Sequence, residues 1–158
     1  MAYQARFPAP FAVLGIKTDG TALTALDFLP LGTPVLEPQD AISRQVCTQL
    51  QAYLADPLFS FDLPLSLRGT AFQSTVWQAL RQIPSGSTQS YGELAKRIHS
   101  APRAVGQACG ANPIPVIIPC HRVLARDGLG GFMKSTGVDS LAIKRWLLQH
   151  ELRQSKPA

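Results

Sequence analysis

Residues 112–123 read Asn-Pro-Ile-Pro-Val-Ile-Ile-Pro-Cys-His-Arg-Val, and the rest of the 158-residue chain is organised around this stretch. The apolar run Val116–Ile118 predicts a short buried strand or extended segment. Three prolines stiffen the approach, because each fixes its own φ and pushes the preceding residue toward extended geometry. The run ends at Cys120, which His121 and Arg122 follow at once. Neighbouring imidazole and guanidinium groups favour a thiolate, so Cys120 is a candidate nucleophile; the alternative is an inert buried thiol.

Composition narrows the class of protein. With 46% hydrophobic residues, the chain can bury the core of one domain or of two small ones. No apolar run approaches the roughly 20 residues of a membrane span, and the N-terminus lacks the pattern of a signal peptide. Cys47, Cys109 and Cys120 are an odd number of cysteines without metal-type spacing. Free thiols predict a reducing, intracellular and therefore cytoplasmic setting.

Basic residues are concentrated in the half of the chain that contains Cys120. Residues 1–70 carry four Lys or Arg against six acidic residues, whereas residues 71–158 carry eleven against four. Such asymmetry favours a polyanionic partner for the second half. A merely soluble basic surface is the alternative.

The first half predicts a sheet and one helix. Two strand-like runs, 11–16 and 22–29, flank Asp19-Gly20, a strong turn signal, so an antiparallel hairpin is expected. Asp40 can cap a helix that follows, whose one apolar face is formed by Ile42, Val46, Leu50, Tyr53 and Leu54. The apolar, proline-interrupted run 59–67 predicts an edge strand or an extended linker. No residue of this half carries recognisable chemistry, and we interpret it as a brace.

The second half predicts helices. Thr70 and Ser90 each lie three residues before a Gln or Glu, which is the capping-box pattern of a helix start. Ser100 is expected to cap a further helix that ends near Gly110. Two short helices joined by a tight turn in a basic region predict a helix-turn-helix.

The predicted fold class is therefore mixed α/β, of the α+β kind. A small N-terminal domain with an antiparallel sheet and one helix, residues 1–68, precedes a mainly helical C-terminal domain with a helix-turn-helix, residues 69–158.

The last helix of the predicted pair is unusually bare. Ala104, Gly106, Ala108 and Gly110 leave one flank almost without side chains. This flank could approach bases in a narrow groove or pack closely against another helix. Arg103 lies in the first turn, where the helix dipole disfavours a cation, which points to a role outside the helix or to a solvated surface arginine.

The stretch around Cys120 resembles the active-site signature of the O6-alkylguanine-DNA alkyltransferases, also called methylated-DNA–protein-cysteine methyltransferases. Further matches are Ser-Tyr-Gly-Glu-Leu-Ala at 90–95, Arg-Ala-Val-Gly at 103–106, Lys-Arg-Trp-Leu-Leu at 144–148 and His-Glu at 150–151. The resemblance covers about 70–152; the N-terminal part resembles the family only in size and coarse pattern.

The resemblance implies DNA repair by irreversible transfer of the alkyl group from O6-alkylguanine in double-stranded DNA to the protein's own cysteine. No metal or cofactor is expected, and the zinc ligands that some members carry in the N-terminal domain are absent from that half of the sequence. A thioether product, with nothing predicted to hydrolyse it, implies a single-use protein, and a stoichiometric reaction gives no reason for a dimer. The preferred alkyl size and any activity on O4-alkylthymine stay open.

The implied catalytic residues are Cys120, His121, Glu151 and Asn112. Cys120 supplies the sulfur, and His121 is its nearest base, directly or through a water. Glu151 would fix the imidazole tautomer, as the acid does in a triad. Asn112 would orient the turn around Cys120, and Arg122 is expected to pair internally.

The resemblance also assigns DNA and substrate contacts. Implied DNA-binding residues are Tyr91, Arg103, Ala104, Gly106, Lys144 and Arg145, and the implied substrate pocket is formed by Tyr91, Val123, Phe132 and Met133. The recognition helix would lie in the minor groove, Arg103 would enter the base stack, and Tyr91 would lend its hydroxyl to the flipped base. Phe132 and Met133 replace the tyrosine and serine of many members.

Two other functions fit parts of this pattern. A cysteine hydrolase would use Cys, His and Glu for acyl transfer and would turn over a peptide or ester, but it leaves the basic helix pair unexplained. A non-enzymatic DNA-binding module fits the helix pair and the charge, but it leaves Cys120 without a use. Alkylation of Cys120 by lesion-bearing DNA separates both from the alkyltransferase.

Overall fold

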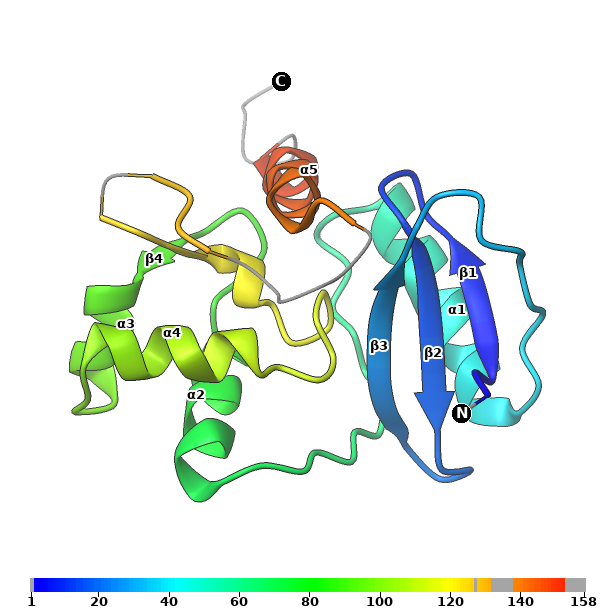
Figure 1. Cartoon of the computed structure of the whole chain (residues 1–158), viewed down its shortest axis with the longest axis horizontal. Helices are drawn as coiled ribbons and strands as arrows, with labels where there is room; N and C mark the ends of the chain where they lie inside the picture. Colours follow the sequence, from blue (N-terminus) through cyan, green and yellow to red (C-terminus); the bar gives the residue numbers. More distant parts are fainter. Residues whose placement is uncertain (1, 127, 132–137, 153–158) are drawn as a thin grey trace.

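The structure is a computed structural model that describes residues 2–126, 128–131 and 138–152. Its elements are β1 (Ala5–Pro8), β2 (Val13–Thr18), β3 (Leu23–Leu29), α1 (Ala41–Ala55), α2 (Ala71–Arg81), β4 (Gln89–Ser90), α3 (Tyr91–Arg97), α4 (Pro102–Gly110), the 3-10 helix η1 (Cys120–Arg122), β5 (Val123–Leu124) and α5 (Ser140–Leu152). The three-stranded sheet and α1 lie at one end of the molecule, and α2, α3 and α4 lie at the other (Figure 1). The predicted mixed α/β class is confirmed.

The sheet is an antiparallel meander in the order β1, β2, β3. The predicted hairpin is confirmed: Asp19 accepts backbone hydrogen bonds from Thr21 and Ala22, and Gly20 has a φ of 92°. That left-handed conformation favours glycine. Strand β1 was not predicted, because its four residues, Ala-Arg-Phe-Pro, are too few to show an alternating pattern and end in a proline.

Helix α1 covers one face of the sheet, as Figure 1 shows. It begins where the sequence predicts, because Asp40 accepts a hydrogen bond from the Ser43 amide at 2.8 Å in a capping box. Its buried face includes Val46, Leu50 and Tyr53, which join the core of the molecule.

The edge of β3 ties the two ends of the molecule together. The Leu23 amide donates to the Pro64 carbonyl at 2.8 Å, so the predicted extended linker runs beside β3. The Leu26 amide donates to the Pro113 carbonyl at 2.9 Å. The strand therefore anchors both the linker and the approach to Cys120. We keep the proposed domain boundary at residues 68 and 69, just before α2.

Helices α3 and α4 pack against each other as the predicted helix-turn-helix. The capping boxes at Thr70 and Ser90 are confirmed. The prediction that Ser100 caps α4 is wrong: the N-cap is Ala101, which provides no side-chain hydrogen bond, and Pro102 opens the helix. Proline fits there because its missing N–H has no partner in a first helical turn.

The run Val116–Ile118 is buried but is not a strand, so that prediction is wrong in part. The Ile118 amide bonds back to the Ile114 carbonyl at 2.9 Å, and Val116 has a φ of 74°. The chain therefore makes a tight turn, because the flanking prolines have no N–H for a ladder. A β-branched residue with positive φ is rare and must be held by its surroundings. The turn leads directly into η1.

Helix α5 lies between the sheet and the helical end (Figure 1). Its Trp146 packs on Phe11 at 4.8 Å between ring centroids and stacks on His150 at 4.9 Å. The sequence offers Asp139 or Ser140 as its cap and predicts Leu141 on its inward face. Asp139 is the cap, because it accepts from the Ala142 amide, whereas Leu141 is exposed, so that part of the prediction is wrong. Among the helices of the described ranges, none is long and apolar enough to cross a membrane.

Candidate active site

Cys120 begins η1 and is 2% exposed. The buried amide of Asn112 donates to the Cys120 sulfur at 3.2 Å and to the Ile118 carbonyl at 2.8 Å. The Asn112 oxygen accepts from the Ile114 amide at 2.9 Å. One side chain thus joins the end of α4 to the turn that presents the sulfur, which is the position that the sequence assigned to it.

Glu151 reaches the site from the end of α5. It accepts a hydrogen bond from His121 Nε2 at 2.7 Å, and the Arg122 guanidinium binds both of its oxygens, at 2.8 and 3.0 Å. Burial raises the pKa of Glu151, but the His121 and Arg122 donors outweigh burial and hold the pKa well below its usual value. The carboxylate is therefore ionised, and the predicted internal pairing of Arg122 is present.

The ionised carboxylate fixes the tautomer of His121. Because Glu151 can only accept, Nε2 carries the proton and Nδ1 holds a lone pair. Nδ1 is buried and has no hydrogen-bond partner within the described ranges. Burial lowers the pKa of His121 although Glu151 opposes it, so the ring is neutral near pH 7. The arrangement provides a neutral base next in sequence to the thiol.

The resting thiol is not activated by neighbouring charge, which corrects the expectation from sequence. Burial raises the pKa of Cys120 to about 11, and the Asn112 hydrogen bond and the Lys144 charge offset this only in part. His121 is neutral, and Arg122 is engaged by Glu151 and by the Ile83 carbonyl at 2.6 Å. Formation of the thiolate therefore requires transfer of its proton.

Lys144 does not lie on the surface, so the prediction that it contacts phosphate is wrong. It is 0% exposed, and its ammonium donates to the carbonyls of Val123, Leu129 and Gly131 at 2.7 to 2.8 Å. Burial lowers its pKa to about 8. The sequence does not distinguish Lys144 from its neighbour Arg145, because both are cations in the same helix. Arg145 is exposed, as expected. Lys144 ties β5 to the glycine-rich segment that follows.

Tyr91 stands at the start of α3 with its ring partly buried. Its hydroxyl donates to the Gly131 carbonyl at 3.3 Å, and burial raises its pKa to about 12. A Cβ on Gly130, whose φ is 70°, would lie 3.0 Å from the Tyr91 ring. Gly130 is thus a site residue that the sequence did not distinguish from its neighbours Gly128 and Gly131. Buried Val123 lies on β5, and Phe132 and Met133 lie outside the described residues.

The face of α4 carries the remaining predicted DNA contacts. The Arg103 side chain is exposed and makes no hydrogen bond or ion pair with the part of the chain that the structure describes. Ala104 and Gly106 are half-exposed, whereas Ala108 is buried and its carbonyl accepts from the Trp77 indole at 2.9 Å. Both interpretations of the small residues therefore hold for α4: one side of the helix packs on α2, and another side stays open.

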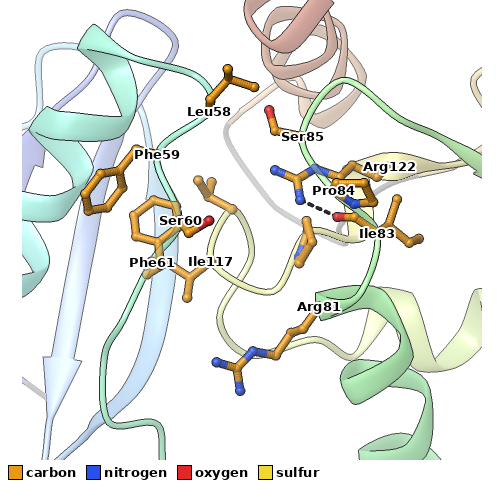
Figure 2. A pocket seen from close by; sticks show the side chains of 12 residues that line it. Leu58, Phe59, Ser60, Phe61, Arg81, Ile83, Pro84, Ser85, Ile117 and Arg122 are labelled. Carbon is orange, nitrogen blue, oxygen red and sulfur yellow. Dashed lines mark hydrogen bonds between the residues drawn. The ribbon is translucent and has the colours of Figure 1, made fainter.

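A cavity of about 270 Å³ has Arg122 as one of its lining residues. Figure 2 shows it between segment 58–61 and the turn 83–85, with the Arg122 guanidinium bonded to the Ile83 carbonyl at its wall. Cys120 is not among its lining residues, so this cavity is not the space that faces the sulfur.

Comparison with known proteins agrees with this geometry. Residues 71–153 match the family described as 6-O-methylguanine DNA methyltransferase, DNA binding domain. The fold matches the crystal structure of Mycobacterium tuberculosis OGT in complex with DNA, with a TM-score of 0.82 and 39% identity over 98% of this chain and 94% of that one. The fold and the site thus define the class of DNA-repair proteins that transfer a methyl group from methylated DNA to a cysteine.

Related sequences extend over nearly the whole chain. The methylated-DNA–protein-cysteine methyltransferases of Methanosarcina acetivorans and Haemophilus influenzae are 41% and 40% identical to it, each over 94% of this chain and over 97% and 86% of their own lengths. The chain belongs to the family of methylated-DNA–protein-cysteine methyltransferases, DNA-repair proteins that transfer a methyl group to a cysteine. The likeness includes the N-terminal half, where the motifs alone indicated only a coarse resemblance.

Proposed function

We propose that this protein removes the alkyl group from O6-alkylguanine in double-stranded DNA and keeps it on Cys120. The observation that carries the proposal is the buried sulfur held by Asn112, next in sequence to a histidine whose free nitrogen is a base. Family membership supplies the reaction class.

The first step is proton transfer from the thiol. His121 Nδ1 receives the proton, directly or through one water molecule, and Glu151 stabilises the imidazolium that results. The sulfur then attacks the alkyl carbon in line as the carbon–O6 bond breaks. Because the thiolate forms only in the occupied site, the resting protein avoids reaction with other electrophiles.

The guanine must leave as a stable group. The Tyr91 hydroxyl stays protonated at neutral pH, since burial raises its pKa to about 12, and its 3.3 Å bond to Gly131 is long enough to exchange for a base. It donates a proton to the departing guanine ring and regains one, by way of solvent, from His121. The products are a thioether and an unmodified guanine.

The target base must be flipped out of the duplex to reach Cys120. Helix α4 offers an open small-residue surface at Ala104 and Gly106 for the minor groove. The proposal that Arg103 fills the gap in the base stack is supported by its side chain, which is exposed and unpaired among the described residues. Arg145 is an exposed cation suited to a phosphate contact.

The protein is single-use in this proposal, because a thioether is chemically inert and no described group is poised to hydrolyse it. A monomer suffices for a stoichiometric reaction. Cys47, Cys109 and Cys120 are not joined in disulfides, which fits a reducing cytoplasm.

Intact mass after incubation with duplex DNA containing O6-methylguanine tests the proposal. We expect one added methyl group per molecule, mapped to Cys120, and none in Cys120→Ser. Cys47→Ser is the matched control, since Cys47 is half-exposed on α1, and it should methylate like the parent protein. Folded protein with no added mass would refute alkyl transfer, and turnover of a peptide or ester would favour a hydrolase.

A further inference from the structure

Tyr53 connects the sheet end of the molecule to the active site. It lies on α1 and is 1% exposed, and its hydroxyl donates to Glu151 Oε2 at 2.6 Å, across 98 residues of sequence. The sequence predicted only a core position on the apolar face of that helix. The N-terminal half therefore contributes a polar group to the machinery around Cys120.

The oxygen that accepts from Tyr53 is the oxygen that holds the histidine. Glu151 Oε2 also accepts from His121 Nε2 at 2.7 Å and from Arg122 Nη2 at 3.0 Å. Each added donor stabilises the carboxylate and reduces the charge that it offers to the others. The strength of the His121–Glu151 bond therefore depends on the Tyr53 hydroxyl.

Packing leaves the hydroxyl of Tyr53 little freedom to turn away. The His150 ring lies edge-on to the Tyr53 ring at 5.1 Å, and His150 Nε2 lies 2.8 Å from the Tyr53 carbonyl. Phe61 closes another side of the ring at 5.4 Å. Burial and the Glu151 charge raise the pKa of Tyr53 well above its usual value, so it remains a donor.

We propose that Tyr53 is a positioning residue of the alkyl-transfer reaction: its hydroxyl shares the Glu151 carboxylate with His121 and sets how strongly that carboxylate holds the imidazole. The inference rests on the proposed role of His121 as the base. Among the described residues, the charged groups that act on the His121 ring are Glu151 and Lys144 from α5 and its chain neighbour Arg122. Removing the Tyr53 hydroxyl leaves all of them in place.

The test is Tyr53→Phe, followed by ¹⁵N NMR titration of the His121 ring. Without the hydroxyl, Glu151 binds the imidazolium more strongly, so the His121 pKa should rise by about one unit. The acid limb of the pH–rate profile for transfer from O6-benzylguanine should move to higher pH by the same amount, since the base must be neutral. Tyr3→Phe is the matched control, because the Tyr3 hydroxyl donates to Asp27 at 2.8 Å within the sheet.

A second variant reverses the sign and keeps the ring packing. Replacing Tyr53 with 3-fluorotyrosine makes the phenol a stronger donor, so the His121 pKa should fall. An unchanged His121 pKa in both variants, with transfer slowed equally at every pH, would overturn the inference and leave Tyr53 a packing residue. The titration needs no alkyl transfer, so it decides this point even if the parent protein fails to accept a methyl group.

Discussion

Glu151 accepts a hydrogen bond from His121 at 2.7 Å and binds the Arg122 guanidinium with both oxygens, although 30 residues of sequence separate it from His121. All three groups are buried or largely buried. The Glu151 carboxylate therefore has two effects. It fixes the tautomer of His121, and it attaches the end of α5 to η1.

Glu151→Gln should therefore lower both stability and transfer. A buried guanidinium without its counter-ion costs about 3 to 5 kcal/mol, so we expect a loss of free energy of unfolding of this size in urea titrations at pH 7. The amide no longer fixes the Nε2–H tautomer, so the transfer rate should fall as well. Asp62→Asn, which changes an exposed carboxylate, is the control and should change neither quantity.

The buried Glu151 carboxylate also makes the free energy of unfolding depend on pH in a defined direction. The folded-state pKa of Glu151 is depressed, so its contribution is complete above the unfolded value of about 4.3 and is lost as pH falls below it. The stability difference between the parent protein and Glu151→Gln should therefore shrink between about pH 4.5 and pH 2. A difference that stays constant over this range would show that Glu151 is not ionised in the folded protein.

The Cys120 thiol should react with simple electrophiles only at high pH. Its pKa of about 11 predicts that carbamidomethylation by iodoacetamide accelerates about tenfold per pH unit between pH 7 and pH 10. Peptide mapping measures this separately for Cys120 and for Cys47, which is half-exposed and should react faster. A rate for Cys120 that levels off near neutral pH would mean that the thiolate already exists at rest.

Local signals made most of the fold predictable. Asp19-Gly20, Asp40, Thr70 and Ser90 each act within three residues, and each hairpin or cap is found where the sequence places it. The prediction of a buried strand or extended segment at Val116–Ile118 is right about burial and wrong about backbone shape, because hydrophobic periodicity does not report a positive φ. That conformation is imposed by packing, and no residue of the run reveals it.

Nonlocal contacts explain what the sequence left out of the site. Lys144 has the composition of a surface cation, and only the fold reveals three carbonyls around its ammonium. Tyr53 likewise fits an apolar stripe until α5 brings Glu151 to its hydroxyl. The motif around Cys120 predicts a nucleophile and a base at adjacent positions, and this stays a prediction; burial, however, reverses the expected effect on the thiol pKa.

Gly130→Ala should disturb the Tyr91 side of the site. Gly130 has a φ of 70°, a conformation that is about 1 to 2 kcal/mol less favourable for alanine. The new Cβ would also lie 3.0 Å from the Tyr91 ring and 3.1 Å from the Ala125 backbone. We expect lower thermal stability and slower transfer from O6-benzylguanine. Gly128→Ala is the matched control, since nothing lies within 4 Å of its Cβ position. Equal effects of the two changes would remove any specific role for Gly130.

Arg103→Ala separates DNA handling from chemistry. Arg103 is exposed on α4 and takes no part in the hydrogen bonds around Glu151, so its loss should leave the reaction with free O6-benzylguanine within about twofold of the parent rate. Repair of O6-methylguanine in duplex DNA should slow by roughly ten- to a hundredfold, because unstacking the flipped base costs a few kcal/mol that a side chain in the gap offsets. Arg44→Ala removes an exposed arginine from α1 and controls for net charge. If both arginine variants lost duplex repair alike, attraction to phosphate would explain the effect, and equal losses on duplex and free base would place Arg103 in the chemistry instead.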